Sequence, residues 1–348
     1  MKMLKKILSF AFIAILLLQS IENNAYAILD SSPQNPINVA VFLNDFNDQF
    51  ISSVKKSLED IQKENDNRVQ FTFFDAKGNQ VSQNESIDQS LNKNFDLFVL
   101  NLVSTDIDKT KDILTKIMQK NIPLILYYAQ TTPIVNFIKP YGNAVIIDTD
   151  IDQSGILQGK ILSDEWNSNK EALDKNKDNI MQFLMLKGPV NSPETISRTK
   201  NSLQTINESG INTQQLSSIN CNWDEECAKT AVESNLLTLG DRIEVIISNN
   251  DAMAIGAIKA LQKYGYNKSI NSKNIPVVGV DGLPEAQKLI KQGIMTGTAI
   301  QDPREHANAI YMVGMNIVSG KNSLEGTNYK FDETGITIKL PYYEYVAE

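Results

Sequence analysis

Short apolar runs alternate with amphipathic stretches along most of this chain, from about Ile37 onward. The run INVAVFL is followed by FISSVKKSLEDIQKEN, DLFVLNLV by TKDILTKIMQKN, and IPVVGVDG by PEAQKLIKQG. Strands that are apolar throughout and alternate with helices are typical of parallel sheets that helices cover on both faces. The pattern therefore predicts an α/β fold built from βαβ units.

The length of the chain predicts that these units form two lobes. The chain has 348 residues, and a single hydrophobic core stops growing at roughly 250–300 residues. In open α/β sheets, ligands bind beyond the carboxyl ends of the strands. We therefore expect a ligand site where the strand-to-helix turns of two α/β lobes face each other.

The N-terminus has the features of an export signal. Three lysines stand within the first six residues, Ile7–Leu18 is an apolar run of 12 residues, and Ala25-Tyr26-Ala27 has the pattern of a signal peptidase site. We expect residues 1–27 to be a cleaved signal peptide, with an uncleaved anchor as the alternative. In either case the rest of the chain would lie in the periplasm or at the outer face of the cytoplasmic membrane.

The charge of the chain argues against several kinds of partner. Removal of residues 1–27 takes away three lysines and one glutamate, which leaves 30 basic and 40 acidic residues and a net charge of −10. A chain this acidic has no electrostatic reason to bind nucleic acid or anionic lipid. We expect neither partner.

The sequence contains no pattern typical of an enzyme. It lacks the Gly-x-Ser-x-Gly, Gly-x-x-x-x-Gly-Lys and His-Glu-x-x-His motifs. Its single histidine, His306, falls in a predicted helix, where we expect it to be partly exposed. Paired carboxylates could still do acid–base work without histidine, but we predict a protein that is not an enzyme.

The only two cysteines, Cys221 and Cys227, stand in the stretch CNWDEEC. An exported chain can form disulfides, but spacing alone does not show whether the two Cα atoms come within bonding range. The sequence leaves the pairing open.

Polar and aromatic side chains follow five of the predicted strands. These residues are Asp48, Phe50, Ser192, Glu194, Arg198, Trp223, Asn250 and Asp281. Planar polar groups can meet two neighbouring hydroxyls, and aromatic faces can cover the C–H faces of a sugar ring. At any one turn the alternative is a helix cap; Asp251, for example, is expected to N-cap the helix AMAIGAIKAL. Five such turns together favour a sugar site.

Several longer stretches carry a family resemblance: NDQFISSVKKSL, NKDNIMQFLMLKG, IEVIISNNDAMAIGAIKAL, VVGVDGLPEAQKLIKQG and EGTNYKFD. From about Ile37 to Tyr342 the chain resembles the periplasmic glucose/galactose-binding proteins, of the sugar-binding family that serves ABC transporters and, in some members, chemoreceptors. The resemblance implies the type I periplasmic-binding fold, in which two Rossmann-like lobes with parallel sheets are joined by a three-strand hinge. It assigns residues 36–148 and 302–338 to one lobe, and 149–301 and 339–348 to the other. The hinge strands would lie near Asp148–Asp150, near Gln301, and near Ile338–Lys339.

The resemblance also assigns roles in the sugar site. Phe50 and Trp223 would sandwich the sugar ring. Hydroxyls would be held by four further residues that match the family pattern, Asp48, Arg198, Asn250 and Asp281. The chain departs from that pattern at Ser192, Glu194, Gln301 and a fourth position that falls at Ala129 or Gln130. We therefore expect glucose or galactose as the ligand, with a pentose or another hexose as the alternative.

The loop DKNKDNIMQ has part of the spacing of a calcium site. Asp174, Asn176 and Asp178 occupy positions 1, 3 and 5, and Gln182 occupies position 9, but position 12 is Met185 instead of a bidentate glutamate. The resemblance implies that Glu244 supplies the missing carboxylate from a distant strand and that the carbonyl of Ile180 completes the shell. Asn179 stands where a turn glycine is usual, and asparagine tolerates the left-handed backbone conformation that such a turn needs. We therefore expect a structural Ca²⁺.

Two uses of a sugar-binding protein remain open from the sequence. The closed form could deliver a monosaccharide to an ABC permease, or it could be presented to a membrane histidine kinase or chemoreceptor. A secreted carbohydrate-active enzyme is a third reading, which would need a catalytic carboxylate pair. We expect the mature protein to be a monomer.

Overall fold

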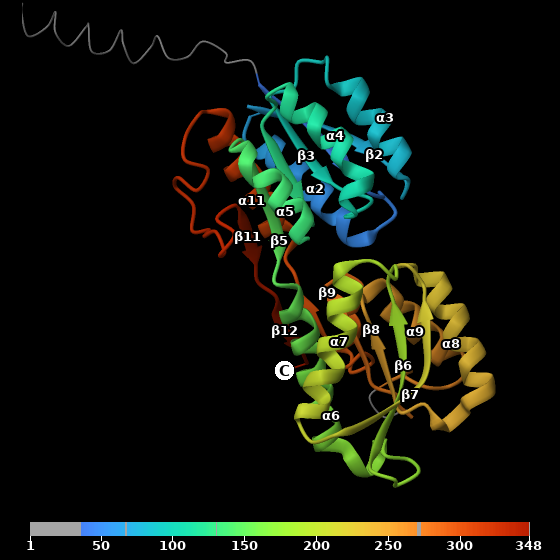
Figure 1. Ribbon diagram of the computed structural model, residues 1–348. Helices are drawn as coiled ribbons and strands as arrows, with labels where there is room; N and C mark the ends of the chain where they lie inside the picture. Colours follow the sequence, from blue (N-terminus) through green and yellow to red (C-terminus); the bar gives the residue numbers. More distant parts are fainter. Residues whose placement is uncertain (1–35, 67, 130, 270–272, 348) are drawn as a thin grey trace, which may run out of the picture.

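The computed structural model describes residues 36–347 except 67, 130 and 270–272. The predicted signal peptide, 1–27, and the candidate site residue Gln130 lie outside the described residues. The chain forms two α/β lobes, stacked one above the other and joined along one side (Figure 1). Within the described part of the chain, no helix is both long and apolar enough to cross a lipid bilayer.

The first lobe is built on a six-stranded sheet in which every pairing is parallel. Its strands, in spatial order, are β11 (Thr337–Leu340), β5 (Ala144–Thr149), β4 (Leu124–Tyr127), β3 (Leu97–Asn101), β1 (Ile37–Leu43) and β2 (Val69–Asp75). The helices are α2 (Gln49–Glu64), α3 (Gln80–Ser90), α4 (Ile107–Gln119), α5 (Thr132–Ile138), a short 3₁₀ turn at Lys139–Tyr141, and α11 (Pro303–Val318).

Both faces of this sheet are covered by helices, as the apolar strands predict. In β1, Val39 and Val41 pack with α2 and α11 on one face, whereas Ala40 and Phe42 pack with α3, α4 and α5 on the other. Successive side chains of a strand point to opposite faces, so a strand that is buried on both sides must be apolar throughout.

The second lobe repeats this plan with one antiparallel edge strand. The spatial order is β12 (Tyr343–Val346), β10 (Gly297–Ile300), β9 (Val277–Asp281), β8 (Val245–Ser248), β6 (Ile180–Lys187) and β7 (Asn212–Asn220), and only β12 runs antiparallel to its neighbour. One face packs on α8 (Glu225–Leu239), α9 (Asp251–Lys263) and α10 (Pro284–Lys291). The other face packs on α6 (Ile151–Leu173) and α7 (Pro193–Glu208).

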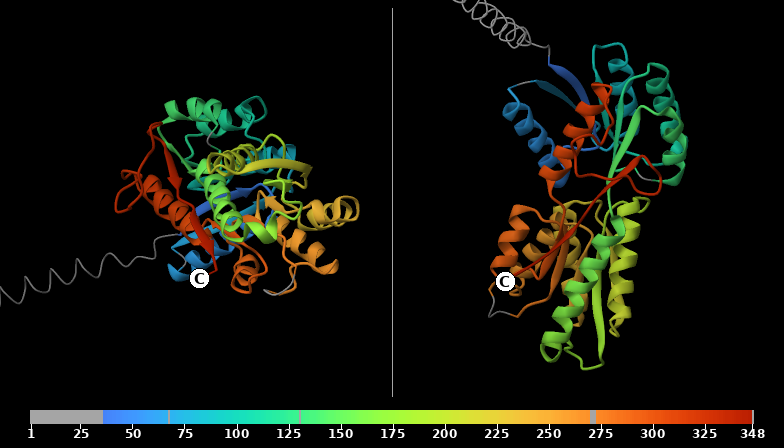
Figure 2. Two further views of the ribbon diagram at one scale, coloured as in Figure 1. Left: turned by 90° about the horizontal axis from the view of Figure 1, so that it is seen from below. Right: turned by 90° about the vertical axis from the view of Figure 1, so that its left-hand side faces the viewer.

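The chain passes between the lobes three times, from β5 to α6, from β10 to α11, and from β11 to β12. The last crossing is visible as the red segment that runs from one lobe to the other (Figure 2). It falls at Pro341 and Tyr342, just after the expected Ile338–Lys339, which lie inside β11 and pair with β5. Proline has no N–H with which to extend a ladder, which accounts for the end of the strand at Leu340. The two-lobed α/β fold with parallel sheets is as predicted.

Candidate ligand-binding site between the lobes

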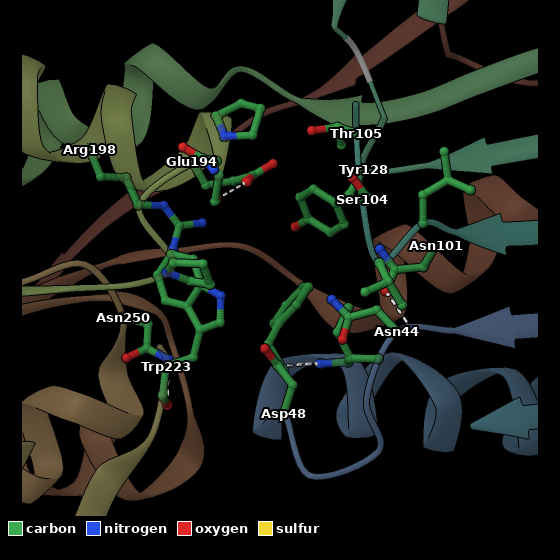
Figure 3. Close-up of a pocket in the computed structure, with 18 of the residues that line it drawn as sticks. Asn44, Asp48, Asn101, Ser104, Thr105, Tyr128, Glu194, Arg198, Trp223 and Asn250 are labelled. Carbon is green, nitrogen blue, oxygen red and sulfur yellow. Dashed lines mark hydrogen bonds between the residues drawn. The ribbon is translucent and has the colours of Figure 1, made fainter. Parts of the chain in front are cut away.

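A cavity of about 420 Å³ lies between the lobes, where the carboxyl ends of strands from both sheets face each other. Side chains from both lobes point into it (Figure 3). Nine of the sequence-predicted site residues line this cavity: Asp48, Phe50, Ser192, Glu194, Arg198, Trp223, Asn250, Asp281 and Gln301.

Sequence reasoning missed part of the wall that the first lobe provides. Asn44 follows β1, Asn101 ends β3, and Tyr128 follows β4, and all three line the cavity. The rule that directed attention to strand ends would also have found them. Of the two alternatives for the fourth position, Ala129 is fully buried and does not line the cavity, and Gln130 lies outside the described residues. Tyr128, one residue after the end of β4, does line it.

Arg198 is a buried positive charge in the wall of the second lobe. It is only 4% exposed, and it donates from Nη1 to the carbonyl of Asn249 (2.7 Å) and from Nη2 to the hydroxyl of Tyr342 (3.0 Å). Nη1 also lies 3.8 Å from Oδ1 of Asp281. Its Nε has no hydrogen-bond partner among the described residues. A buried donor without a partner is costly, so this N–H is suited to a ligand oxygen.

Two carboxyl groups face the cavity from opposite lobes, Asp48 half-buried and Asp281 buried. Asp48 N-caps α2, with Oδ1 accepting from the N–H of Ile51 (3.0 Å). Asp281 Oδ1 accepts from Nε2 of Gln301 (2.7 Å). Burial raises the pKa of Asp48, and it raises the pKa of Asp281 well above its usual value. Each group can therefore accept a hydrogen bond from a hydroxyl or, when protonated, donate one.

A chain of hydrogen bonds connects the lobes through the second crossing. The hydroxyl of Tyr128 donates to Oε1 of Gln301, whose Nε2 donates to Asp281. Both ends of the Gln301 amide thus have partners within the protein. Tyr128 also has a positive φ of 56° and Asp281 one of 124°. Residues other than glycine rarely adopt such backbone conformations, and the residues that do are concentrated at ligand sites.

Aromatic rings from the two lobes form part of the cavity wall. Trp223 follows β7 with φ at 71°, and its indole lies against Gly188, where an added Cβ would come 2.2 Å from two ring carbons. Phe50 stands in the first turn of α2 and makes edge-on contacts with Tyr128 and His306, with ring centroids 6.3 and 5.3 Å apart. Each lobe thus contributes an aromatic face.

The expectation that His306 is partly exposed is wrong. It is 1% exposed and lies behind Phe50, on the face of α11 that also carries Ile310 and Val313 into the core. Its Nδ1 is 2.8 Å from the hydroxyl of Tyr127, and its Nε2 has no partner among the described residues. Burial lowers the pKa of His306 to about 3.

The prediction that Asp251 caps α9 is also wrong. The N-cap is Asn250, whose Oδ1 accepts from the N–H of Met253 (3.0 Å). Asparagine caps as well as aspartate does, so the side chain of Asp251, one residue later, can make hydrogen bonds elsewhere. Its carboxylate accepts from the N–H groups of Gly282 (2.7 Å) and Leu283 (2.8 Å) and from the hydroxyl of Thr298 (2.7 Å). It therefore fixes the backbone that follows Asp281.

The candidate calcium loop brings its predicted residues together. Glu244 is 1% exposed and accepts from the N–H groups of Lys175 and Gln182, each at 2.9 Å. The side chains of Asn176 and Gln182 both donate to Oδ2 of Asp178, at 2.8 and 3.1 Å. Asn179 has the expected positive φ, 61°.

Three features of this loop bear on whether it fits a cation. The buried Oε1 of Gln182 has no hydrogen-bond partner in the described part of the chain, which leaves a free acceptor beside the carboxylates. Burial raises the pKa of Glu244, and the nearby Asp174 and Asp178 raise it further. Among the described residues, however, no three Asp, Glu, His or Cys side chains are placed so that they could hold a metal ion by themselves. A cation here would depend on the neutral oxygens as well.

Cys221 and Cys227 form a disulfide, with their Cα atoms 5.4 Å apart. The bridge lies beside the cavity, because Trp223 stands between the two cysteines.

Comparison with known proteins defines the class of this chain. It matches the model of the periplasmic binding protein domain over residues 39–322. It is 33% identical over 305 residues to the D-galactose/methyl-galactoside binding periplasmic protein MglB of Haemophilus influenzae, a match that covers 87% of this chain and 88% of the relative. The chain therefore belongs to the periplasmic binding protein domain family.

Solved structures with lower sequence identity share the fold. One is an ABC transporter solute binding protein from Bacillus halodurans with bound myo-inositol, with a TM-score of 0.71 and 21% identity over 90% of this chain and 96% of that chain. Another is an ABC transporter periplasmic solute binding protein from Actinobacillus succinogenes with bound D-allose, with a TM-score of 0.71 and 19% identity over 89% of this chain and 97% of that chain.

Proposed function

We propose that this protein is an extracytoplasmic monosaccharide receptor that closes on a glucose- or galactose-like sugar and delivers it to an ABC permease. The observation that carries the proposal is the cavity between the lobes, which combines an aromatic face from each lobe with buried carboxyl, guanidinium and amide groups. The sugar class is supported by the relative that is 33% identical, whose name states that it binds D-galactose and methyl-galactoside.

The polar groups of the cavity match the chemistry of a sugar ring. The free Nε–H of Arg198 would donate to a ring hydroxyl, while Asp281 and Asp48 would receive hydroxyl hydrogens from opposite lobes. Phe50 and Trp223 would cover the C–H faces of the ring. Because a pyranose is polar at its edge and apolar on its faces, it would satisfy both sets of groups at once.

Closure of the lobes would provide the signal that a membrane partner reads. A sugar that contacts both lobes shifts an open–closed equilibrium by the contacts it gains only in the closed form. The lobes already touch where Nε2 of Gln49 in α2 donates to Glu225 of α8 (3.3 Å). Delivery to a permease is favoured over the sensory alternative because the proteins of similar fold described above are solute-binding components of ABC transporters.

We also propose that Ca²⁺ binds the loop at Asp174–Gln182 together with Glu244. The oxygen ligands present there are those that Ca²⁺ prefers, and the free Oε1 of Gln182 is available to it. The ion would connect the loop to the strand edge next to Glu244. Its role would be structural, since the loop is not part of the cavity wall.

Titration calorimetry of the exported chain against a panel of monosaccharides tests the proposed function. D-Galactose, D-glucose, D-allose, D-ribose and L-arabinose would each be titrated into the wild type and into two variants. We expect at least one hexose or pentose to bind tightly to the wild type, much more weakly to Trp223→Ala, and unchanged to Tyr264→Ala, in which an exposed aromatic residue outside the cavity is removed. Absence of heat with every sugar would overturn the proposal.

A further inference from the structure

The disulfide closes the loop that carries Trp223. Cys221 follows the last residue of β7 and is 2% exposed, and Cys227 lies in the first turn of α8. Between them Asn222 and Trp223 have φ values of 52° and 71°. Few residues other than glycine adopt this conformation, so the loop needs a restraint that keeps it there.

The N–H of Cys221 donates to the carbonyl of Lys187 (2.8 Å), and beyond that residue the hydrogen bonds of the loop are long or local. The N–H of Asn222 donates to the carbonyl of Lys187 (3.2 Å), and the N–H of Asp224 donates to the carbonyl of Cys221 within the loop itself (2.9 Å). The carbonyl of Trp223 receives a long bond from Nδ2 of Asn250 (3.4 Å). Asn222 and Asp224 are exposed to solvent. Besides the main chain, the disulfide is thus the one covalent connection between the end of β7 and the first turn of α8.

The indole packs closely on its surroundings, so its position in the cavity wall is sensitive to the conformation of the loop. The ring lies directly on Gly188, and the guanidinium of Arg198 is centred 5.7 Å from it. A small change in the loop would therefore tilt the ring away from the cavity. The first residue of α8, Glu225, also contacts Gln49 of the other lobe, so the same loop sets the position of a contact between the lobes.

We propose that the Cys221–Cys227 disulfide positions Trp223 for the ligand, so that the redox state of this pair controls binding affinity. The proposal rests on the proposed function, in which Trp223 covers one face of a sugar ring. In the oxidised protein the indole is held in place before the sugar arrives, which lowers the entropy lost on binding. Reduction by a dithiol breaks the S–S bond, gives two thiols on the protein and oxidises the dithiol to its own disulfide. The lobe stays folded, but the indole loses its fixed position.

The test compares the oxidised, reduced and reoxidised protein in a Trp166→Phe background. The chain has two tryptophans, and Trp166 is buried in the core of the second lobe, so this background leaves Trp223 as the only tryptophan reporter. Calorimetry would use D-galactose, or the sugar of the panel that binds most tightly. We expect reduction with dithiothreitol to weaken binding on the order of tenfold, and reoxidation to restore it. The Cys221→Ala/Cys227→Ala variant should match the reduced protein.

A control separates positioning from general stability. Val232→Ala removes two methyl groups from the buried face of α8 without touching the loop. It should lower the melting temperature and leave the affinity unchanged. Equal affinity of the oxidised and reduced proteins would overturn the positioning proposal while the proposed function stands.

A measurement without ligand tests the role of the disulfide even if the proposed function is wrong. If the oxidised protein binds none of the sugars, the sugar-receptor proposal is overturned, but the effect of the bridge on the loop can still be measured. We then expect reduction to shift the emission of Trp223 and to speed amide exchange at residues 222–226. Unchanged emission and exchange would overturn the positioning role regardless of the ligand.

Discussion

Replacement of Arg198 by methionine would remove the buried guanidinium from the cavity wall and keep much of the volume of its stem. In the wild type this group donates to the carbonyl of Asn249 and the hydroxyl of Tyr342, and it lies 3.8 Å from Asp281. The variant leaves all three of these groups, each at most 5% exposed, without their charged partner. Arg198→Met should therefore reduce both the stability of the protein and its affinity for sugar.

The size of each effect follows from these contacts. Removal of one member of a buried charge pair costs about 3–5 kcal/mol. Burial already raises the pKa of Asp281, so this carboxyl group can take up a proton and offset part of that loss. We therefore expect the free energy of unfolding to fall by about 3 kcal/mol, at the lower end of that range. Loss of the free Nε–H removes one charge-assisted hydrogen bond to the sugar, worth about 1.5–3 kcal/mol, which corresponds to one to two powers of ten in affinity.

Urea unfolding and titration calorimetry on three variants measure these effects separately. Arg304→Met, which removes an exposed arginine paired with Glu64, is the matched control and should change stability by less than about 1 kcal/mol. Arg198→Met/Asp281→Asn removes both charges and should recover part of the lost stability, but none of the lost affinity. The reasoning would be refuted if Arg198→Met were as stable and bound sugar as tightly as Arg304→Met.

Three further predictions concern other residues. His306→Asn should make stability less sensitive to acid. The pKa of His306 is about 3 in the folded protein and ordinarily 6.5, so between these pH values the unfolded chain binds a proton that the folded protein does not. As the pH is lowered, the free energy of unfolding of the wild type therefore falls by up to about 1.4 kcal/mol per pH unit. Urea unfolding from pH 7 to pH 4 measures this, and parallel curves for both proteins would argue against it. Phe50→Leu should weaken sugar binding by about 0.5–1.5 kcal/mol, whereas Phe74→Leu, which loses a ring stacked on Phe42 away from the cavity, should bind normally in the same calorimeter. A chelator should lower the melting temperature of the wild type but not that of Glu244→Gln; a wild-type melt that does not respond would contradict the calcium proposal.

The parts of the fold that were predicted correctly depend on local pattern. The strand β1 reads as INVAVFL because its alternate residues face two different helical layers, and that requirement is visible in sequence alone. The resemblance puts the third hinge strand near Ile338–Lys339, and in the structure these residues lie inside β11, with the crossing following at Pro341 and Tyr342. Where β11 ends depends on its pairing with β5, which the local sequence pattern does not show.

The two residues whose environment was predicted wrongly, His306 and Asp251, depend on three-dimensional context. His306 was expected to be partly exposed, because the sequence of α11 does not show which face of the helix meets β4 and Phe50. Asp251 was taken for a cap because two adjacent residues, Asn250 and Asp251, can both cap a helix. Only the fold shows that the N–H groups of Gly282 and Leu283 bind the carboxylate instead of the helix N-terminus. In each case the deciding contact comes from a residue far away in the sequence.

The most direct test of the account is a crystal structure of the protein with the monosaccharide that binds most tightly in the calorimetric panel. We expect the sugar ring between Phe50 and Trp223, with one hydroxyl on Nε of Arg198 and others on Asp48 and Asp281, so that both lobes hold it. A sugar bound outside the cavity, or one that contacts a single lobe and leaves Arg198 Nε without a partner, would contradict the account.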